Sequence, residues 1–364
     1  MSRASHGSPP SAVGRSDARA AGPREDASPP ATVVLSALFP HSGQPFAGLF
    51  IRERMFRVGR RLPVTFVVPV PWFPFQGLIR RFRAGFRPPA PVHEVRDGYE
   101  IYYPRFFSFP GVLKRFDGLL MALGVFPRLR RLARAGRCAI IDSHFGYPDG
   151  HAASLLGRWL SVPFTVTLRG NETAKAREPG LGEHLRATFA RASRIFCVSD
   201  SLRRFALSMG AEPDRTLVAS NGVDSDRFRP ESRTDARSAL GIEPSAPVIV
   251  TVGGLTPRKG FHRVIETLPA LRREFPDLVY LVVGGANPED DFEARLRAMV
   301  DELGVADMVR FLGPVDPDRL RFVHAAADLF VLATAREGWA NVLMEAIACG
   351  LPIVATSVDG NPEI

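Results

Sequence analysis

The sequence has little cysteine and no long apolar run, and both absences narrow the classes of protein that it fits. Cys138, Cys197 and Cys349 lie far apart without CxxC spacing, so neither a zinc site nor a disulfide framework is indicated. No apolar stretch approaches the roughly 18 to 20 residues that cross a bilayer. Residues 1–31 lack the apolar core of a secretory signal. We therefore expect a cytoplasmic protein with buried, reduced thiols and a disordered tail at 1–31.

The composition is that of a folded protein with an excess of basic charge. Hydrophobic residues make up 45% of the chain and charged residues 23%, which is typical of a globular protein. At 364 residues the chain is long enough for two domains. The net charge of +9 favours an anionic partner, which on charge alone is a nucleic acid, an anionic lipid or a phosphorylated ligand. The sequence contains no nucleic-acid recognition motif, so we disfavour the first of these.

From residue 31 onward, short apolar runs alternate with amphipathic stretches, which predicts βα units in parallel sheets. The expected strands are Thr32–Phe39, Val64–Pro69, Ala139–Asp142, Phe164–Leu168, Arg194–Val198, Pro247–Val252, Leu278–Gly284, Val309–Gly313, Leu329–Leu332 and Ile353–Thr356, with helices such as Phe261–Arg273 and Asp291–Leu303. The polar, proline-containing segment 221–245 has the composition of a linker. We therefore predict an α/β protein with domains at 32–228 and 229–364 that face each other across a ligand-binding cleft.

Two carboxylates stand eight positions apart in Glu337-Gly-Trp-Ala-Asn-Val-Leu-Met-Glu345, directly after an expected strand. We expect Glu337 in the strand-to-helix loop and Glu345 inside a helix that begins near Asn341. The start of such a helix presents backbone N–H groups and a positive dipole end to a diphosphate. Carboxylates accept hydrogen bonds from sugar hydroxyls, so one acid can hold a hexose and the other a ribose. A bare acidic pair at this spacing is more often surface charge, so the interpretation depends on a second motif.

That second motif, Gly253-Gly-Leu-Thr-Pro-Arg-Lys-Gly260, follows the first expected strand of the second domain. It places the guanidinium of Arg258 beside the ammonium of Lys259 at the carboxyl edge of the sheet. The two cations match a diphosphate that gains negative charge as it leaves. Alone, this loop fits a solvated basic surface equally well. Together with the two carboxylates, it indicates a site for a nucleotide diphosphate sugar.

These motifs resemble those of retaining glycosyltransferase family 4, the glycosyl transferases group 1, whose members have the GT-B fold of two Rossmann-like domains. The resemblance extends to Asn221-Gly-Val-Asp224, Phe228, Pro230 and the closing run Gly360-Asn-Pro-Glu363. Its implied site residues are Arg258, Lys259, Asn341 and Val342 at the donor diphosphate, Glu337 at the transferred sugar, Glu345 at the ribose, and Leu312 and Val315 in a loop beside the base. Family members continue beyond this closing run, so we expect the donor domain to be truncated at Ile364.

Residues of the first half are candidates for the acceptor side. His144 follows an expected strand, at an edge that faces the cleft. A lone histidine there is more often structural, but the matching histidine of the family is an active-site residue, so we expect His144 and Glu337 to be catalytic. Arg169 and Glu172 follow the next strand and are expected to shape the acceptor side, although relatives often carry histidine at the position of Arg169. Gly48 is either a glycine that approaches the diphosphate or an ordinary helix-start glycine.

Aromatic and basic residues alternate from Trp72 to Arg87 with no acid between them. This run fits the interface of an anionic membrane, and it fits equally a solvated basic face with aromatic core anchors. We keep both interpretations, the first of which places the protein on the inner face of the plasma membrane.

The expected activity is transfer of a hexose from a nucleotide diphosphate sugar to a glycan or lipid-linked saccharide, in polysaccharide or cell-envelope synthesis. The resemblance implies retention at the anomeric carbon. We expect no metal or other cofactor, because Arg258 and Lys259 neutralise the leaving group. The D-x-D pairs at Asp224 and Asp316 are interpreted as a linker segment and a helix cap. A sugar-nucleotide epimerase of the same fold, which needs no acceptor, is the alternative.

Overall fold

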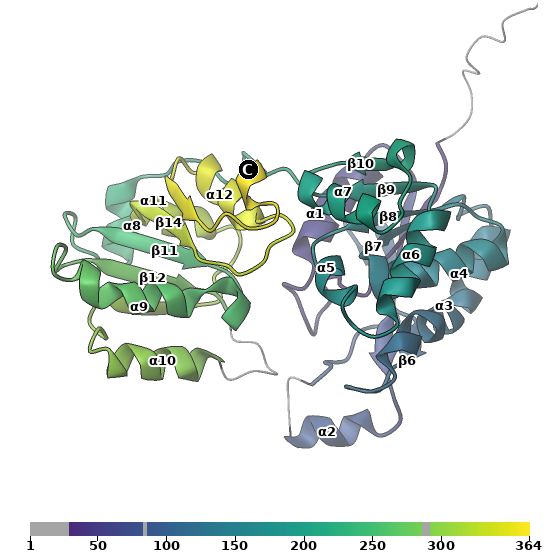
Figure 1. Ribbon diagram of the computed structural model, residues 1–364, viewed down its shortest axis with the longest axis horizontal. Helices are drawn as coiled ribbons and strands as arrows, with labels where there is room; N and C mark the ends of the chain where they lie inside the picture. Colours follow the sequence, from purple (N-terminus) through teal and green to yellow (C-terminus); the bar gives the residue numbers. More distant parts are fainter. Residues whose placement is uncertain (1–28, 83–85, 286–291) are drawn as a thin grey trace, which may run out of the picture.

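The computed structural model describes residues 29–82, 86–285 and 292–364, which form two α/β domains (Figure 1). The disordered tail expected at 1–31 lies almost wholly outside the described residues. In the first domain, eight strands form one sheet in the order β10-β9-β8-β7-β1-β2-β5-β4. These strands are β1 (Thr32–Leu35), β2 (Val64–Val67), β4 (His93–Arg96), β5 (Tyr99–Tyr102), β7 (Ile140–His144), β8 (Phe164–Leu168), β9 (Arg194–Cys197) and β10 (Thr216–Val218).

Helices cover this first sheet, and a small two-stranded sheet of β3 (Val70–Trp72) and β6 (Arg105–Phe107) lies beside it. The helices are α1 (Leu49–Gly59), α2 (Gln76–Phe82), α3 (Asp117–Arg134), α4 (His151–Leu160), α5 (Glu172–Lys175), α6 (Leu181–Arg191) and α7 (Asp200–Ser208). No helix of the described residues is long and apolar enough to cross a membrane. All three cysteines are free and buried, as expected.

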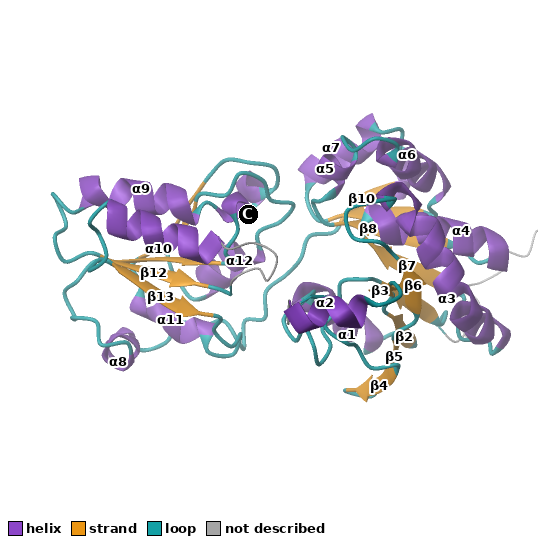
Figure 2. Cartoon of the chain, turned by 90° about the horizontal axis from the view of Figure 1, so that it is seen from below, coloured by secondary structure: helices purple, strands orange, loops and turns teal. Residues whose placement is uncertain are grey.

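The second domain contains a five-stranded parallel sheet in the order β13-β12-β11-β14-β15. Its elements are α8 (Arg233–Ala239), β11 (Val248–Val252), α9 (Phe261–Leu271), β12 (Val279–Val283), α10 (Phe292–Glu302), β13 (Val309–Gly313), α11 (Leu320–Ala326), β14 (Leu329–Leu332), α12 (Asn341–Ala348) and β15 (Ile353–Ala355). Figure 2 shows α9 and α10 on one face of the sheet and α8 and α11 on the other. Every residue of β11 and β12 is buried, as expected for strands covered on both faces.

The segment 221–245 is only partly a linker, which corrects the prediction. Its second half contains α8, whose Arg237 is 2% exposed. Arg237 donates hydrogen bonds to the carbonyl oxygen of Ala326, at 3.0 Å, and to Asp328, at 2.7 Å. A buried charge needs such partners, and the sequence pattern gave no sign of them. The helix therefore belongs to the second domain, and the crossing between the domains is limited to the residues before it.

The two domains touch at the loop that follows β14. A Cβ atom added to Gly170, at the end of β8, would lie 2.5 Å from the Cα atom of Gly338, so neither position has room for a side chain. Trp339 packs against the hydrophobic core of the first domain. The carboxylate of Glu363 accepts hydrogen bonds from the backbone N–H groups of Asp200 and Ser201, at 2.5 and 2.8 Å, at the start of α7. The C-terminal run thus contacts the first domain.

Candidate active site

The loop between β14 and α12 brings together the acid and the two cations expected at the donor. Arg258 and Lys259 both donate to Glu337 Oε2, at 2.9 and 2.7 Å. Gly260 adopts φ +77°, and an added Cβ would lie 1.9 Å from the carbonyl oxygen of Ala333. Only glycine fits this close approach of the two loops. The structure thus assembles one charged cluster from two segments separated by almost eighty residues.

These side chains line a cavity of about 380 Å³ between the domains, which we call the Glu337 cavity. Asn341 and Val342, the first residues of α12, also line it. No side chain caps this helix start. The N–H groups of Asn341 and Leu343 donate to the carbonyl oxygens of Trp339 and Ala340, at 3.1 and 2.9 Å, and the positive dipole end of the helix suits an anionic ligand. The prediction that Glu337 precedes this helix and that Glu345 lies inside it is confirmed.

A second cavity of about 570 Å³ contains Glu345, and we call it the Glu345 cavity. It shares Phe50, Asn221, Asn341 and Val342 with the first cavity, so the start of α12 separates the two. Burial raises the pKa of the Glu345 carboxyl to about 7, although nearby Arg227 and Lys259 lower it. Ionising this carboxyl in the free protein therefore costs free energy, which is common for acids in functional sites.

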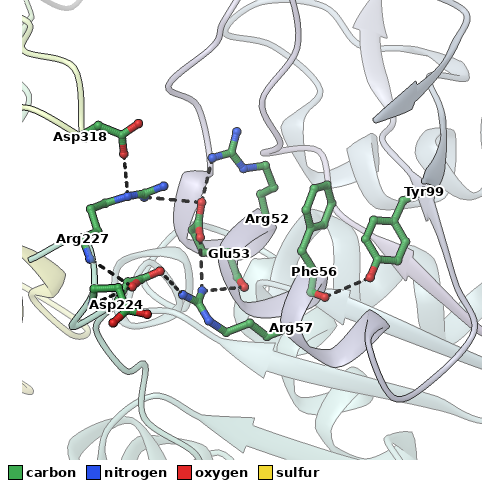
Figure 3. Close-up of polar contacts among 9 residues, drawn as sticks. Arg52, Glu53, Phe56, Arg57, Tyr99, Asp224, Arg227 and Asp318 are labelled. Atoms are coloured by element: carbon green, nitrogen blue, oxygen red, sulfur yellow. Dashed lines mark hydrogen bonds and ion pairs between the residues drawn. The ribbon is translucent and has the colours of Figure 1, made fainter. Parts of the chain in front are cut away.

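A network of charges joins the domains along the wall of the Glu345 cavity (Figure 3). Arg57 of α1 pairs with Asp224 at 2.6 Å and with Glu53 at 3.2 Å. Arg227 pairs with Glu53 at 3.7 Å and with Asp318 of the second domain at 2.8 Å. These pairs are partly exposed, so each contributes little stability alone. Together, these pairs hold α1 beside the cavity that contains Glu345.

The two D-x-D pairs form local hydrogen bonds. Asp224 Oδ1 accepts from the backbone N–H groups of Asp226 and Arg227, at 3.1 and 3.3 Å. Asp316 Oδ1 accepts from that of Asp318 at 2.8 Å. Each first aspartate therefore has a role in its own turn.

On the first-domain side, Arg169 lines the Glu337 cavity and His144 does not. Arg169 contacts His144 Nδ1 at 2.9 Å and donates to Asn221 Oδ1 at 2.9 Å. His144 is completely buried, and burial together with Arg169 holds its pKa well below the usual range. A neutral imidazole whose Nδ1 accepts from Arg169 carries its proton on Nε2. His144 thus lies behind Arg169 in this structure, rather than on the cavity wall as expected.

The structure places Glu172, predicted to shape the acceptor side, in the interior of the first domain. The side chain is fully buried and does not reach either cavity. Its oxygens accept hydrogen bonds from the backbone N–H groups of Gly146, Arg169 and Gly170, at 2.8 to 3.3 Å. Glu172 therefore stabilises the turn after β8 and leaves its carboxylate no free face for a ligand.

Three further predicted residues lie next to the cavities rather than on their walls. Gly48 adopts φ +65°, and an added Cβ would lie 2.4 Å from the carbonyl oxygen of Leu38. Tight packing against the chain thus accounts for this glycine, and its diphosphate role stays a prediction. Leu312 and Val315 pack against the core of the second domain, while Pro317 and Leu320 of the following segment line the Glu345 cavity.

Several residues of the site were missed by the sequence reasoning. Asn221 donates to Asn341 Oδ1 at 3.0 Å and accepts from Arg169, so it connects the two domains at the start of α12. Its place in the Asn-Gly-Val-Asp motif was the available signal. Phe50 and Arg227 had no such signal. Phe50 reaches the cavities from α1, and Arg227 reaches the Glu345 cavity from the connection between the domains.

The arrangement suits a ligand that is charged in the middle and hydroxylated at both ends. The start of α12, Arg258 and Lys259 provide positive charge for a diphosphate. Glu337 lies on one side of this region and Glu345 on the other. Each acid can accept hydrogen bonds from sugar hydroxyls.

Comparisons with known proteins agree with this geometry. Residues 78–227 match the family described as Glycosyltransferase Family 4, and residues 232–364 match Glycosyl transferases group 1. The boundary between the two matches falls in the segment that connects the domains.

Among curated proteins, the chain is 37% identical over 289 residues to D-inositol 3-phosphate glycosyltransferase of Geodermatophilus obscurus, covering 74% of this chain and 64% of the relative. It is 31% identical over 299 residues to the protein of the same name from Actinosynnema mirum, covering 75% and 69%. The chain thus spans about two thirds of the length of these two relatives.

Solved structures show the same fold. Anabaena HepE in complex with UDP and glucose superimposes with a TM-score of 0.68 at 19% identity, covering 91% of this chain and 82% of that one. Sucrose-phosphate synthase from Thermosynechococcus elongatus gives a TM-score of 0.69 at 20% identity, covering 90% and 82%. Both similarities extend over both domains.

Proposed function

Because this chain belongs to the glycosyltransferases of group 1 and family 4, we propose that it transfers a hexose, with retention, from a nucleotide diphosphate sugar to an acceptor hydroxyl. The observation that carries the proposal is the pair of cavities that meet at the start of α12. The sugar lies by Glu337, the diphosphate by Arg258, Lys259 and α12, and the nucleoside in the Glu345 cavity. A sugar-nucleotide epimerase would use the same donor cleft, but the family matches favour transfer.

The proposed chemistry needs no enzymic nucleophile and no metal. The bond between the anomeric carbon and the leaving phosphate oxygen breaks, and the acceptor oxygen attacks from the same face. The acceptor proton passes to an oxygen of the departing phosphate. Arg258, Lys259 and the dipole of α12 stabilise the negative charge that develops there. Among the described residues lining the Glu337 cavity, Glu337 is the only acid, and its carboxylate forms ion pairs with Arg258 and Lys259.

For the acceptor, we propose a hydroxyl of a glycan or lipid-linked saccharide in cell-envelope synthesis. A phosphorylated polyol is the second candidate, since the curated relatives are named for D-inositol 3-phosphate. The two are separated by incubating the protein with a nucleotide sugar and each acceptor class and detecting the product by mass spectrometry. The anomeric configuration of the product, read by NMR, tests retention.

The donor proposal is tested first by thermal stabilisation with a panel of UDP, GDP and ADP sugars. A ligand that binds only the native state raises its melting temperature. We expect one nucleotide to stabilise the wild type and to stabilise the E345A variant less. If no sugar nucleotide raises the melting temperature of the wild type, the proposed function fails.

We also propose that the protein works on an anionic membrane surface at the inner face of the plasma membrane. Phe75 and Phe82, at the two ends of α2, are 87% and 84% exposed. Between them stand Arg80 and Arg81, and α2 projects from the first domain in Figure 1. Aromatic rings beside arginines suit the headgroup region of anionic lipids. Flotation with vesicles of phosphatidylglycerol, but not of phosphatidylcholine alone, is the expected result. If the protein floats with neither kind of vesicle, the proposal is contradicted.

A further inference from the structure

The Glu337 cavity has more positive charge than a donor diphosphate requires. The described residues lining it include the cations Arg169, Arg258, Lys259 and Arg336 and the single acid Glu337. Their sum is +3, and the diphosphate of a nucleotide sugar carries two negative charges. One positive charge therefore remains after the proposed donor has bound.

Among these four cations, Arg169 is the one that is buried. It is 9% exposed, and the described residues contain no carboxylate that forms an ion pair with it. Its two side-chain hydrogen bonds go to neutral groups, the Asn221 amide and the His144 imidazole. A guanidinium has five N–H donors, and the buried Nε has no partner among the described residues. Most of its donor capacity is thus unused in the free protein.

Burial makes this arrangement costly, so the site favours an anion. Burial, and next the nearby Arg54, lower the pKa of Arg169 to about 9, although Asp142 and Glu172 act against this. A buried charge that forms no ion pair is unfavourable. The Arg169 Cζ atom lies 5.1 Å from the centre of the Phe50 ring, which restricts where the guanidinium can turn. A bound anion would supply an ion-pair partner and accept hydrogen bonds from the free N–H groups.

The position of Arg169 separates it from the diphosphate site. Arg258 and Lys259 come from the second domain, and Arg169 comes from the end of β8 in the first. The backbone beside it, at Gly170, packs against Gly338, the residue after Glu337. The guanidinium thus belongs to the wall where the transferred sugar and the acceptor meet in the proposed function.

We propose that Arg169 binds an anionic oxygen group, a phosphate or a carboxylate, that is separate from the donor diphosphate and is carried by the acceptor or by the transferred sugar. This inference rests on the proposed function of the cavity. His144 is then a positioning residue, since it holds one end of the guanidinium without reaching the ligand. Arg169 then favours substrates that carry a negative charge at this position.

Calorimetry on the full chain tests this with two pairs of probes. In the donor arm, UDP-glucuronate is compared with UDP-glucose. In the acceptor arm, inositol 1-phosphate is compared with inositol in the presence of saturating UDP. We expect the wild type to bind the charged member of one pair at least tenfold more tightly than the neutral member. The arm that shows the preference identifies the molecule that carries the anion.

The R169Q variant is expected to lose this preference while still binding UDP or UDP-glucose. R169K is expected to recover part of it, since lysine keeps the charge and loses the bidentate geometry. R158Q, which removes an exposed arginine of α4, is the control and keeps the full preference.

A wild type that binds charged and neutral probes alike in both arms overturns the inference without any variant. A folded R169Q with the full preference also overturns it. Lack of all nucleotide binding in the wild type instead rejects the proposed function.

Discussion

The buried carboxyl of Glu345 leads to a prediction in which stability and binding change in opposite directions. Burial raises its pKa from 4.5 to about 7. The folded state therefore prefers the protonated acid, and stability falls as pH rises from about 4.5 to about 7. At about 1.4 kcal/mol per pKa unit, the ionised form costs the folded state up to about 3 kcal/mol at pH 8. At pH 5 the cost is below about 1 kcal/mol, because the folded protein binds the proton.

The E345Q variant keeps the shape of the side chain and removes the charge. We expect urea denaturation to show E345Q more stable than the wild type at pH 8, with a clearly smaller difference at pH 5. Calorimetry at pH 8 is expected to show at least a tenfold weaker affinity for the stabilising nucleotide, since hydrogen bonds to a charged group contribute about 1.5 to 3 kcal/mol. E266Q, which changes an exposed acid of α9, is the control and should change neither the stability nor the affinity for the nucleotide. A variant that is less stable than the wild type at pH 8, or that binds nucleotide normally, would refute the reasoning.

Three further predictions concern the loops that meet at Glu337 and the metal-free chemistry. K259Q is expected to weaken binding of the donor at least tenfold in calorimetry, because it removes the ammonium that faces the diphosphate site; an unchanged affinity would exclude that role. G260A is expected to lower the free energy of unfolding by at least about 2 kcal/mol, since its Cβ would overlap the Ala333 carbonyl. G304A, with a similar left-handed backbone but open space around it, should cost about 1 kcal/mol. Sugar transfer is expected to continue in excess EDTA, and loss of transfer with recovery on adding Mg²⁺ would contradict the metal-free mechanism.

The donor half of the site was predictable because each of its residues follows the end of a strand closely in the sequence. Glu337 follows β14, Glu345 lies within α12, and Arg258 and Lys259 follow β11, as their motifs indicated. In a parallel sheet, the carboxyl ends of neighbouring strands meet at one edge. Predicting the strands was therefore enough to predict that these four side chains lie close together.

The first-domain side could not be predicted in the same way, because burial there depends on contacts between distant segments. His144 ends β7 and Glu172 follows β8, as ligand-binding residues would. Glu172 is nevertheless saturated by backbone N–H groups, one of them from Gly146, across a turn that the sequence did not reveal. The same reason explains α8, whose polar composition hid a buried arginine and its partners.

The contacts between the domains make the site a property of both halves together. Arg169 of the first domain, Asn221 of the connection and Asn341 of α12 form a continuous chain of hydrogen bonds. Both bonds are made by the Asn221 amide, so a ligand that turns the Arg169 guanidinium removes a bond that holds this amide in place. Asn341 stands at the helix start where the donor diphosphate is proposed to bind. An anion on the first-domain side is therefore coupled to the donor through one amide, and replacing Asn221 should weaken that coupling more than it weakens either site alone.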